Sequence, residues 1–246
     1  MLKQCKVHCG FINVATVGWL LISTIFLPGR PVNADPFHRQ VINGELAAVR
    51  RAIARDEALA TMNDELGRSP LHLAVINGHM ALVNVLINAG ADVNSIDRLK
   101  GYTPLHYAAF YSYPGIMLFL LSRRADFLIA DRDGNLPLHL AAANGCQATV
   151  EALLLHKASP DCLNNNWQTP LHLAARASGN LKDFPAASDR DDDYLGVARQ
   201  LLEAGAITGV HDIWRNLPGT IAWQRDPGSG FPGKFERLLK EFSRAR

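Results

Sequence analysis

Hydrophobic and polar residues recur along this chain in blocks of about 33 residues. Each block begins with a polar residue and proline, continues with a short apolar run, and often passes through Asn-Gly into a second apolar run. The first run has helical spacing, as in Leu71-His72-Leu73-Ala74, and the second ends on a branched pair such as Leu86-Ile87. The pattern therefore predicts a helix, a turn, a second helix and a polar loop in each block.

Four tetrapeptides mark the start of the first helix in successive blocks. Their first residues are 34, 33 and 33 positions apart, and a fixed period of this length is typical of a stacked array rather than a globule with one central core. Ser or Thr in three copies is a good N-cap, and proline follows where its missing N–H is not needed. The copies are Ser69-Pro70-Leu71-His72, Thr103-Pro104-Leu105-His106, Leu136-Pro137-Leu138-His139 and Thr169-Pro170-Leu171-His172.

This pattern resembles the ankyrin repeat, because the TPLH helix start, the Asn-Gly turn and the Gly-Ala-Asp-Val-Asn exit at 90–94 fall in register. The resemblance covers residues 35–246 and implies an all-α ankyrin-repeat solenoid of six helix-turn-helix units. It also implies protein binding by a concave surface and its loop tips, without catalysis and without a cofactor. The expected units are a degenerate one at 35–63, repeats at 64–96, 97–130, 131–163 and 164–211, and a degenerate one at 212–246.

The first 34 residues follow a different pattern, which is typical of a secretory signal peptide. Two lysines precede an apolar run at 11–27, and Val32-Asn33-Ala34 offers small residues where a signal peptidase reads them. We therefore predict cleavage between Ala34 and Asp35, and a periplasmic or secreted mature protein without membrane contact. The alternative is an uncleaved anchor through residues 11–27, although this run of 17 residues is shorter than the roughly 20 that span a bilayer.

Removal of such a signal changes the charge of the chain. The full sequence has 25 basic and 23 acidic residues, which gives a net charge of +2. Without Lys3, Lys6 and Arg30, 22 basic residues remain beside 23 acidic ones, so the net charge becomes −1. No basic surface is left to attract nucleic acid, and we expect a monomer with a protein partner.

Residues that imitate chemical sites have simpler explanations in the repeat register. The four tetrapeptide histidines recur with the repeat, and neighbouring units hold them about 10 Å apart, too far to share a metal ion. We expect each imidazole to tie the preceding loop to its own helix. Cys146 and Cys162 begin and follow a second helix, roughly 15 Å apart, so we expect two thiols without a disulfide.

Two loops carry incomplete binding motifs. Residues 228–234 have the glycine and lysine spacing of a phosphate-binding loop, but Phe235 stands where that motif needs Ser or Thr. An insertion at 179–193 contains alternating aspartates at 189–193, whereas Tyr194 stands where a calcium loop needs glycine. We therefore expect no bound nucleotide and no metal. A hydrolase that uses this acidic insertion remains a third functional alternative.

The repeat register also predicts which unusual residues face outward. Loop tips and the far ends of the first helices face the groove, and some hold aromatic residues or arginine, the residue types of binding hot spots. Trp167 replaces the glycine found at Gly67, Gly101 and Gly134. The predicted partner-binding residues are Tyr102, Phe110, Tyr111, Trp167, Arg176 and Trp214.

These observations predict a non-catalytic interaction module. The chain resembles the exported ankyrin proteins of bacteria, and this resemblance implies a role in stress protection or in toxin immunity. A host-directed effector that binds a eukaryotic target with the same groove is the second function class. Neither the partner nor the process follows from the fold.

Overall fold

The first helix of each repeat begins with a cap residue and a proline. The computed structural model follows the repeat pattern that the sequence predicts. It describes residues 35–177, 187–225 and 230–244, so the predicted signal segment lies outside the described residues. The regular elements of the described ranges are all helical. They are α1 (Pro36–Ile42), α2 (Leu46–Arg55), the 3-10 helix η1 (Glu57–Thr61), α3 (Pro70–Ile76), α4 (Met80–Asn88), α5 (Pro104–Phe110), α6 (Pro114–Ser122), α7 (Pro137–Ala143), α8 (Gln147–Leu155), α9 (Pro170–Ala177), α10 (Ala187–Glu203), α11 (Pro218–Arg225) and α12 (Phe231–Arg244).

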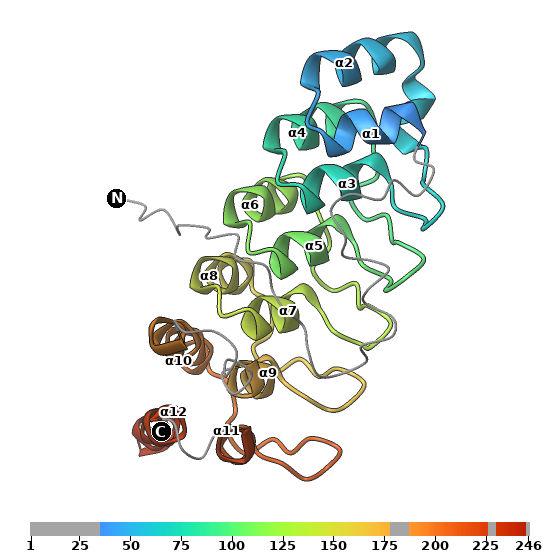
Figure 1. The fold of residues 1–246 in the computed structure, drawn as a ribbon. Coiled ribbons are helices and arrows are strands. Elements are labelled where there is room, and N and C mark those ends of the chain that lie inside the picture. The colour runs from blue at the N-terminus through green and yellow to red at the C-terminus, as the bar shows by residue number, and fades with distance from the viewer. Residues whose placement is uncertain (1–34, 178–186, 226–229, 245–246) are drawn as a thin grey trace. The chain divides into compact units, whose positions relative to one another are not determined.

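These helices form two stacked layers. The proline-led helices α1, α3, α5, α7, α9 and α11 pack in sequence on one another, and α4, α6, α8, α10 and α12 form the second layer beside them (Figure 1). Long loops project from the first layer to one side. The predicted all-α solenoid of helix pairs is therefore confirmed. None of the helices in the described ranges is both long and apolar enough to cross a membrane.

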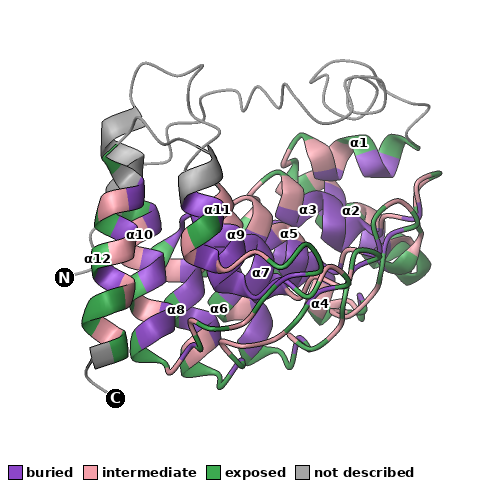
Figure 2. Cartoon of the chain, turned by 90° about the horizontal axis from the view of Figure 1, so that it is seen from below, coloured by how far each residue is buried: buried purple, intermediate pink, exposed green. Residues whose placement is uncertain are grey.

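The core runs between the two layers and repeats with the units. The leucine after each helix-starting proline is at most 1% exposed, as Leu71, Leu105 and Leu138 illustrate. An alanine three positions later is fully buried in the same units, and its small side chain lets neighbouring helices approach closely. Figure 2 shows the buried residues gathered where the helices meet, while the projecting loops are largely exposed. Each repeat thus buries its apolar faces mainly against its neighbours.

The projecting loops form five fingers, which we number along the chain by their residues: finger 1 (64–68), finger 2 (97–102), finger 3 (131–135), finger 4 (164–168) and finger 5 (212–216). An Asp or Asn at the base of each finger accepts backbone N–H groups of the same loop. Asp97 Oδ1, for example, accepts from the N–H groups of Leu99, Lys100 and Gly101 at 2.7–3.1 Å. One backbone hydrogen bond of 2.9–3.1 Å joins each finger to the next, so the fingers form a continuous row.

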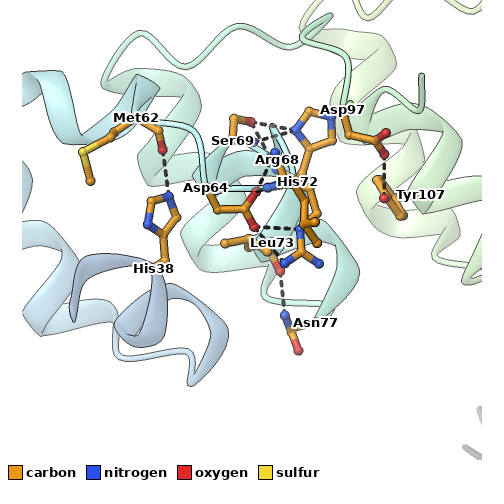
Figure 3. Close-up of polar contacts among 11 residues, drawn as sticks. His38, Met62, Asp64, Arg68, Ser69, His72, Leu73, Asn77, Asp97 and Tyr107 are labelled. Carbon is orange, nitrogen blue, oxygen red and sulfur yellow. Dashed lines mark hydrogen bonds and ion pairs between the residues drawn. The ribbon is translucent and has the colours of Figure 1, made fainter. Parts of the chain in front are cut away.

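The first unit is more regular than expected. Asp35-Pro36-Phe37-His38 stands 34 residues before Ser69-Pro70-Leu71-His72 and has the same role. The Asp35 carboxylate caps α1 by accepting from the Phe37 N–H at 3.0 Å, and His38 Nε2 donates to the Met62 carbonyl at 2.7 Å (Figure 3).

The insertion also differs from the expected loop. Helix α10 already begins at Ala187, so the backbone of the acidic stretch 189–193 is helical. Residues 178–186 of the insertion lie outside the described residues. Asp residues favour the positive end of a helix, which explains why this acidic stretch is compatible with the first turns of α10.

Candidate partner-binding site

A hydrogen-bonded ladder of histidines explains why these residues recur. The Ser69 N–H donates to His72 Nδ1 at 3.0 Å, and the Ser69 hydroxyl lies 2.8 Å from the same nitrogen (Figure 3). Because Nδ1 accepts, Nε2 carries the proton and donates to the Tyr102 carbonyl in finger 2 at 2.9 Å. The predicted tie between loop and helix is confirmed, and the ring also joins its repeat to the next. The same Nε2 bond runs from His106 to Asn135, from His139 to Gln168 and from His172 to Asn216.

The ladder holds its histidines neutral. Burial lowers the pKa of His72, His106 and His172, and it lowers that of His139 to about 4. Both ring nitrogens are engaged with protein atoms, so neither is available as a metal ligand. Across the described ranges, no three His, Cys, Asp or Glu side chains converge on a possible metal site. The rings are structural.

At one rung of the ladder, the hydroxyl is missing. Leu136 stands where the neighbouring units have Ser or Thr, and the Cys162 thiol lies 3.8 Å from His139 Nδ1. Burial raises the pKa of Cys162 to about 12, so this Cys–His contact does not supply a thiolate nucleophile. Cys146 is buried elsewhere and is not bonded to it, as the sequence predicts.

The predicted groove residues fall into separate groups, of which the largest is an aromatic cluster around α5. Five rings meet there through stacked and edge-on contacts, with centroids 5.2–6.5 Å apart. All five side chains are half-buried, and each ring is partly covered by the others. The members of this tyrosine cluster are Tyr102, Tyr107, Phe110, Tyr111 and Tyr113.

Tyr107 and Tyr113, which were not among the predicted partner-binding residues, have structural roles in the cluster. The Tyr107 hydroxyl donates to Asp97 Oδ2 at 2.7 Å and so ties α5 to the base of finger 2 (Figure 3). The Tyr113 ring lies over Gly78, so that a Cβ at that glycine would approach its Cζ to 3.2 Å. Burial raises the pKa of Tyr111 to about 12 and holds this phenol neutral. The cluster therefore presents neutral rings that are already packed together.

The two predicted tryptophans lie on the fingers instead. The Trp167 side chain is 62% exposed and that of Trp214 is 59% exposed, and neither indole has a ring contact with another described aromatic residue. Trp167 has φ +57°, the left-handed conformation that glycine adopts at Gly67, Gly101 and Gly134. A side chain in this conformation costs about 1 kcal/mol or more. Trp167 therefore strains the backbone without burying its ring.

A depression of about 400 Å³ lies beside Trp167, between fingers 4 and 5. The other residues of this fingertip pocket were not among the predicted partner-binding residues. The available signal was Ile213, which follows the Asp at the base of finger 5, where fingers 2 to 4 have Arg98, Arg132 and Asn165. The pocket is lined by Trp167, His211, Asp212, Ile213 and Arg215.

The other predicted positions lie apart from these groups. Arg176 is half-buried in the last turn of α9. Asp35 is the cap of α1, and Ala34 lies outside the described residues. Residues 231–234 of the phosphate-loop motif form the first turn of α12, and residues 228–229 lie outside the described residues.

Comparisons with known proteins agree with this geometry. Residues 37–131 match a family described as ankyrin repeats (3 copies), and residues 138–184 match one described as ankyrin repeats (many copies). Over 65 residues the chain is 42% identical to mouse (Mus musculus) ankyrin repeat and SOCS box protein 16, a match that spans 26% of this chain and 14% of the mouse protein.

A solved structure is similar over most of the chain. It is an ankyrin repeat domain from Acinetobacter baumannii, with a TM-score of 0.70 and 26% identity, and the match covers 85% of this chain and 97% of that domain. The two family matches together span more than half of the sequence, and helices α1 to α9 lie almost entirely within these spans. The chain therefore belongs to the ankyrin repeat family.

Proposed function

We propose that this protein is an exported, non-catalytic module that binds a protein partner through its first helices and fingers. Trp167 carries the proposal. Its indole is mostly exposed, and its backbone has a conformation that glycine adopts without strain. Both features oppose stability, whereas an exposed aromatic ring on a rigid support favours binding. The predicted roles in stress protection or toxin immunity, and the alternative of a host-directed effector, would use the same surface.

Two properties of the described residues support binding over catalysis. The ladder histidines are neutral and fully engaged, and the Cys162 thiol has a raised pKa, so these groups do not provide a base or a nucleophile. The tyrosine cluster and Trp167 instead offer large apolar surfaces with few rotatable bonds. Such surfaces lose little conformational entropy when a partner binds.

The start of the fold supports the proposed export. The small residues before position 35 fit signal cleavage, and Asp35 directly after them caps α1. Cleavage after Ala34 would thus keep the Asp35 cap of α1. N-terminal sequencing of the protein from cell fractions tests this boundary. An intact Met1 in the membrane fraction would favour an anchor through residues 11–27.

A pair of glycine substitutions tests the binding role. Trp167→Gly removes the indole and gives the residue found at this position in three other fingers, so the fold should be retained. Lys157→Gly is the matched control, because Lys157 also has a left-handed conformation, with φ +65°, but lies in the turn after α8 rather than on a finger. Partner capture from a periplasmic extract should fail with Trp167→Gly and Tyr111→Ala and persist with Lys157→Gly. Capture that is unchanged in all three variants would contradict the proposed surface.

A further inference from the structure

The side chains at the fingertips follow a regular arrangement until the last step. On fingers 2 to 4, the residue after the basal Asp or Asn lies over the glycine of the preceding finger. The aliphatic part of Arg98 lies over Gly67, and that of Arg132 lies over Gly101, where a Cβ would approach Cγ to 3.4 Å. In the last step, Ile213 follows the basal Asp and Trp167 replaces the glycine. Between fingers 4 and 5, an isoleucine and a tryptophan thus occupy the positions that hold an arginine or asparagine and a glycine between the earlier fingers.

This last pair is not closed into a core. Ile213 is 46% exposed and Trp167 is 62% exposed, and the fingertip pocket lies between their fingers. Trp214 is exposed on the same finger as Ile213. Trp167 and Ile213 thus place two exposed apolar side chains around this pocket at one end of the row, and exposed apolar patches mark interaction sites.

The rim of the pocket offers hydrogen-bond donors. Arg215 is exposed, and it has φ +61° at the finger position where Trp167 also stands. The carboxylate of Asp212, in contrast, is occupied. Its Oδ1 accepts from the N–H groups of Trp214 and Asn216 at 2.9 and 2.8 Å, and its Oδ2 accepts from the Asn216 side chain. The pocket therefore suits an apolar side chain that is next to a negatively charged group.

Cations continue along the row away from the pocket. Arg98 and Lys100 are exposed on finger 2, and Arg132 is exposed on finger 3, where its guanidinium donates to the Arg98 carbonyl. The basal carboxylates of these fingers are buried and accept backbone N–H groups. Asp133 is the single exposed carboxylate on fingers 2 to 5. At the tips, cationic donors thus outnumber free acceptors.

We propose that the fingers bind an extended acidic segment of the partner protein, anchored by an apolar side chain in the fingertip pocket. This inference rests on the proposed function and names the chemistry of the partner. Each finger consists of an outgoing and a returning stretch of backbone, so neighbouring fingers are about 10 Å apart. This distance corresponds to roughly three residues of extended chain. Because the pocket lies between fingers 4 and 5, Arg132 on finger 3 and Arg98 on finger 2 are about 15 and 25 Å away, so carboxylates about four and seven residues from the anchor would meet them.

A library of random dodecapeptides, displayed on phage and selected on the purified protein, tests the proposal without a known partner. Selected peptides should combine an apolar residue with Asp or Glu about four to seven positions away. Measured by fluorescence polarisation, their affinity should fall about 30-fold or more with Trp167→Gly, a hot-spot loss. It should also fall with Arg132→Gln and with added salt, since exposed charge pairs are screened. Lys157→Gly should leave the affinity unchanged.

The outcomes separate this inference from the proposed function. Selected peptides without an excess of acidic residues, or peptides that bind Trp167→Gly as tightly as the parent, would overturn the fingertip assignment. If such peptides instead lose affinity with Tyr111→Ala, protein binding stands and the tyrosine cluster is its site. If no sequence is enriched over selection on the empty support, the fingertip proposal fails, whereas protein binding is then decided by the capture experiment with Trp167→Gly and Tyr111→Ala.

Discussion

The Cys162 thiol lies 3.8 Å from Nδ1 of His139, at the one ladder position where the helix cap lacks a hydroxyl. In the units of Thr103 and Thr169, the hydroxyl lies 2.8 Å from the corresponding Nδ1. A thiol is a weak donor, and it reaches the ring from the following loop rather than from the cap. The Cys162 side chain thus partly replaces the contact that Leu136 cannot make.

Replacement of Leu136 by threonine should restore the missing cap. The new hydroxyl would accept from the His139 N–H and contact Nδ1, which should raise the free energy of unfolding by about 1 kcal/mol. Urea denaturation measures this change. Cys162→Val should destabilise the parent but be tolerated in the Leu136→Thr background, because Val210 stands at this position in the unit of Thr169. Equal effects of Cys162→Val in both backgrounds would show that the thiol does not assist the ring.

The histidine ladder should make stability depend on pH. Burial lowers the pKa of His139 from 6.5 to about 4, so the unfolded chain takes up a proton before the folded protein does. The stability that the neutral His139 ring contributes is fully present above pH 6.5 and is lost as the pH falls toward 4. The loss for this one ring is about 3 kcal/mol. Urea midpoints across this range measure it, and His139→Gln should make the dependence shallower. An equally steep dependence in that variant would contradict a neutral, buried ring.

Residues in left-handed positions should be replaceable by glycine with a gain in stability. Arg124 and Lys157 both have φ +65° just after a second helix, where Gly90 and Gly205 stand in other units. Glycine removes the strain between Cβ and the backbone, so Lys157→Gly should raise the free energy of unfolding by about 1 kcal/mol. Thermal melting checks the direction. Lys157→Ala, which keeps a Cβ, is the control and should give no such gain.

The sequence predicted the parts of this fold that depend on neighbours along the chain. Proline after a cap predicted where each first helix begins, and the recurrence of His72 and its equivalents predicted their structural role. The first unit was harder to recognise, because Asp35-Pro36-Phe37-His38 has phenylalanine in place of leucine and follows the predicted signal directly. Its role becomes clear only when His38 is seen to reach Met62.

The exposure of the predicted binding residues depends on contacts between side chains that are far apart in the sequence. The repeat pattern alone does not predict these contacts. The register indicated that Tyr102, Phe110 and Tyr111 face the groove, but it did not show how far neighbouring repeats cover their rings. The Tyr113 ring, for example, lies over Gly78, a residue of the preceding unit. The backbone of Trp167 was easier to interpret, because its left-handed conformation follows from the glycine that it replaces.

Within the tyrosine cluster, Tyr107 and Tyr111 should respond differently to substitution. Tyr107 donates to the buried carboxylate of Asp97, so Tyr107→Phe leaves Asp97 Oδ2 without this donor and should lower the free energy of unfolding by about 1–3 kcal/mol. Partner or peptide binding should change little, since the ring itself remains.

Tyr111→Ala removes a ring that stacks on Tyr107 and Tyr113, with centroids 6.3 and 6.0 Å away. If this ring belongs to the binding surface, its loss should weaken binding at temperatures where the variant is still folded. Paired melting curves and binding isotherms separate the two effects. A Tyr111→Ala variant that melts earlier yet binds as tightly as the parent would assign the ring to the packing of the repeat, and the fingers would then be the remaining binding surface.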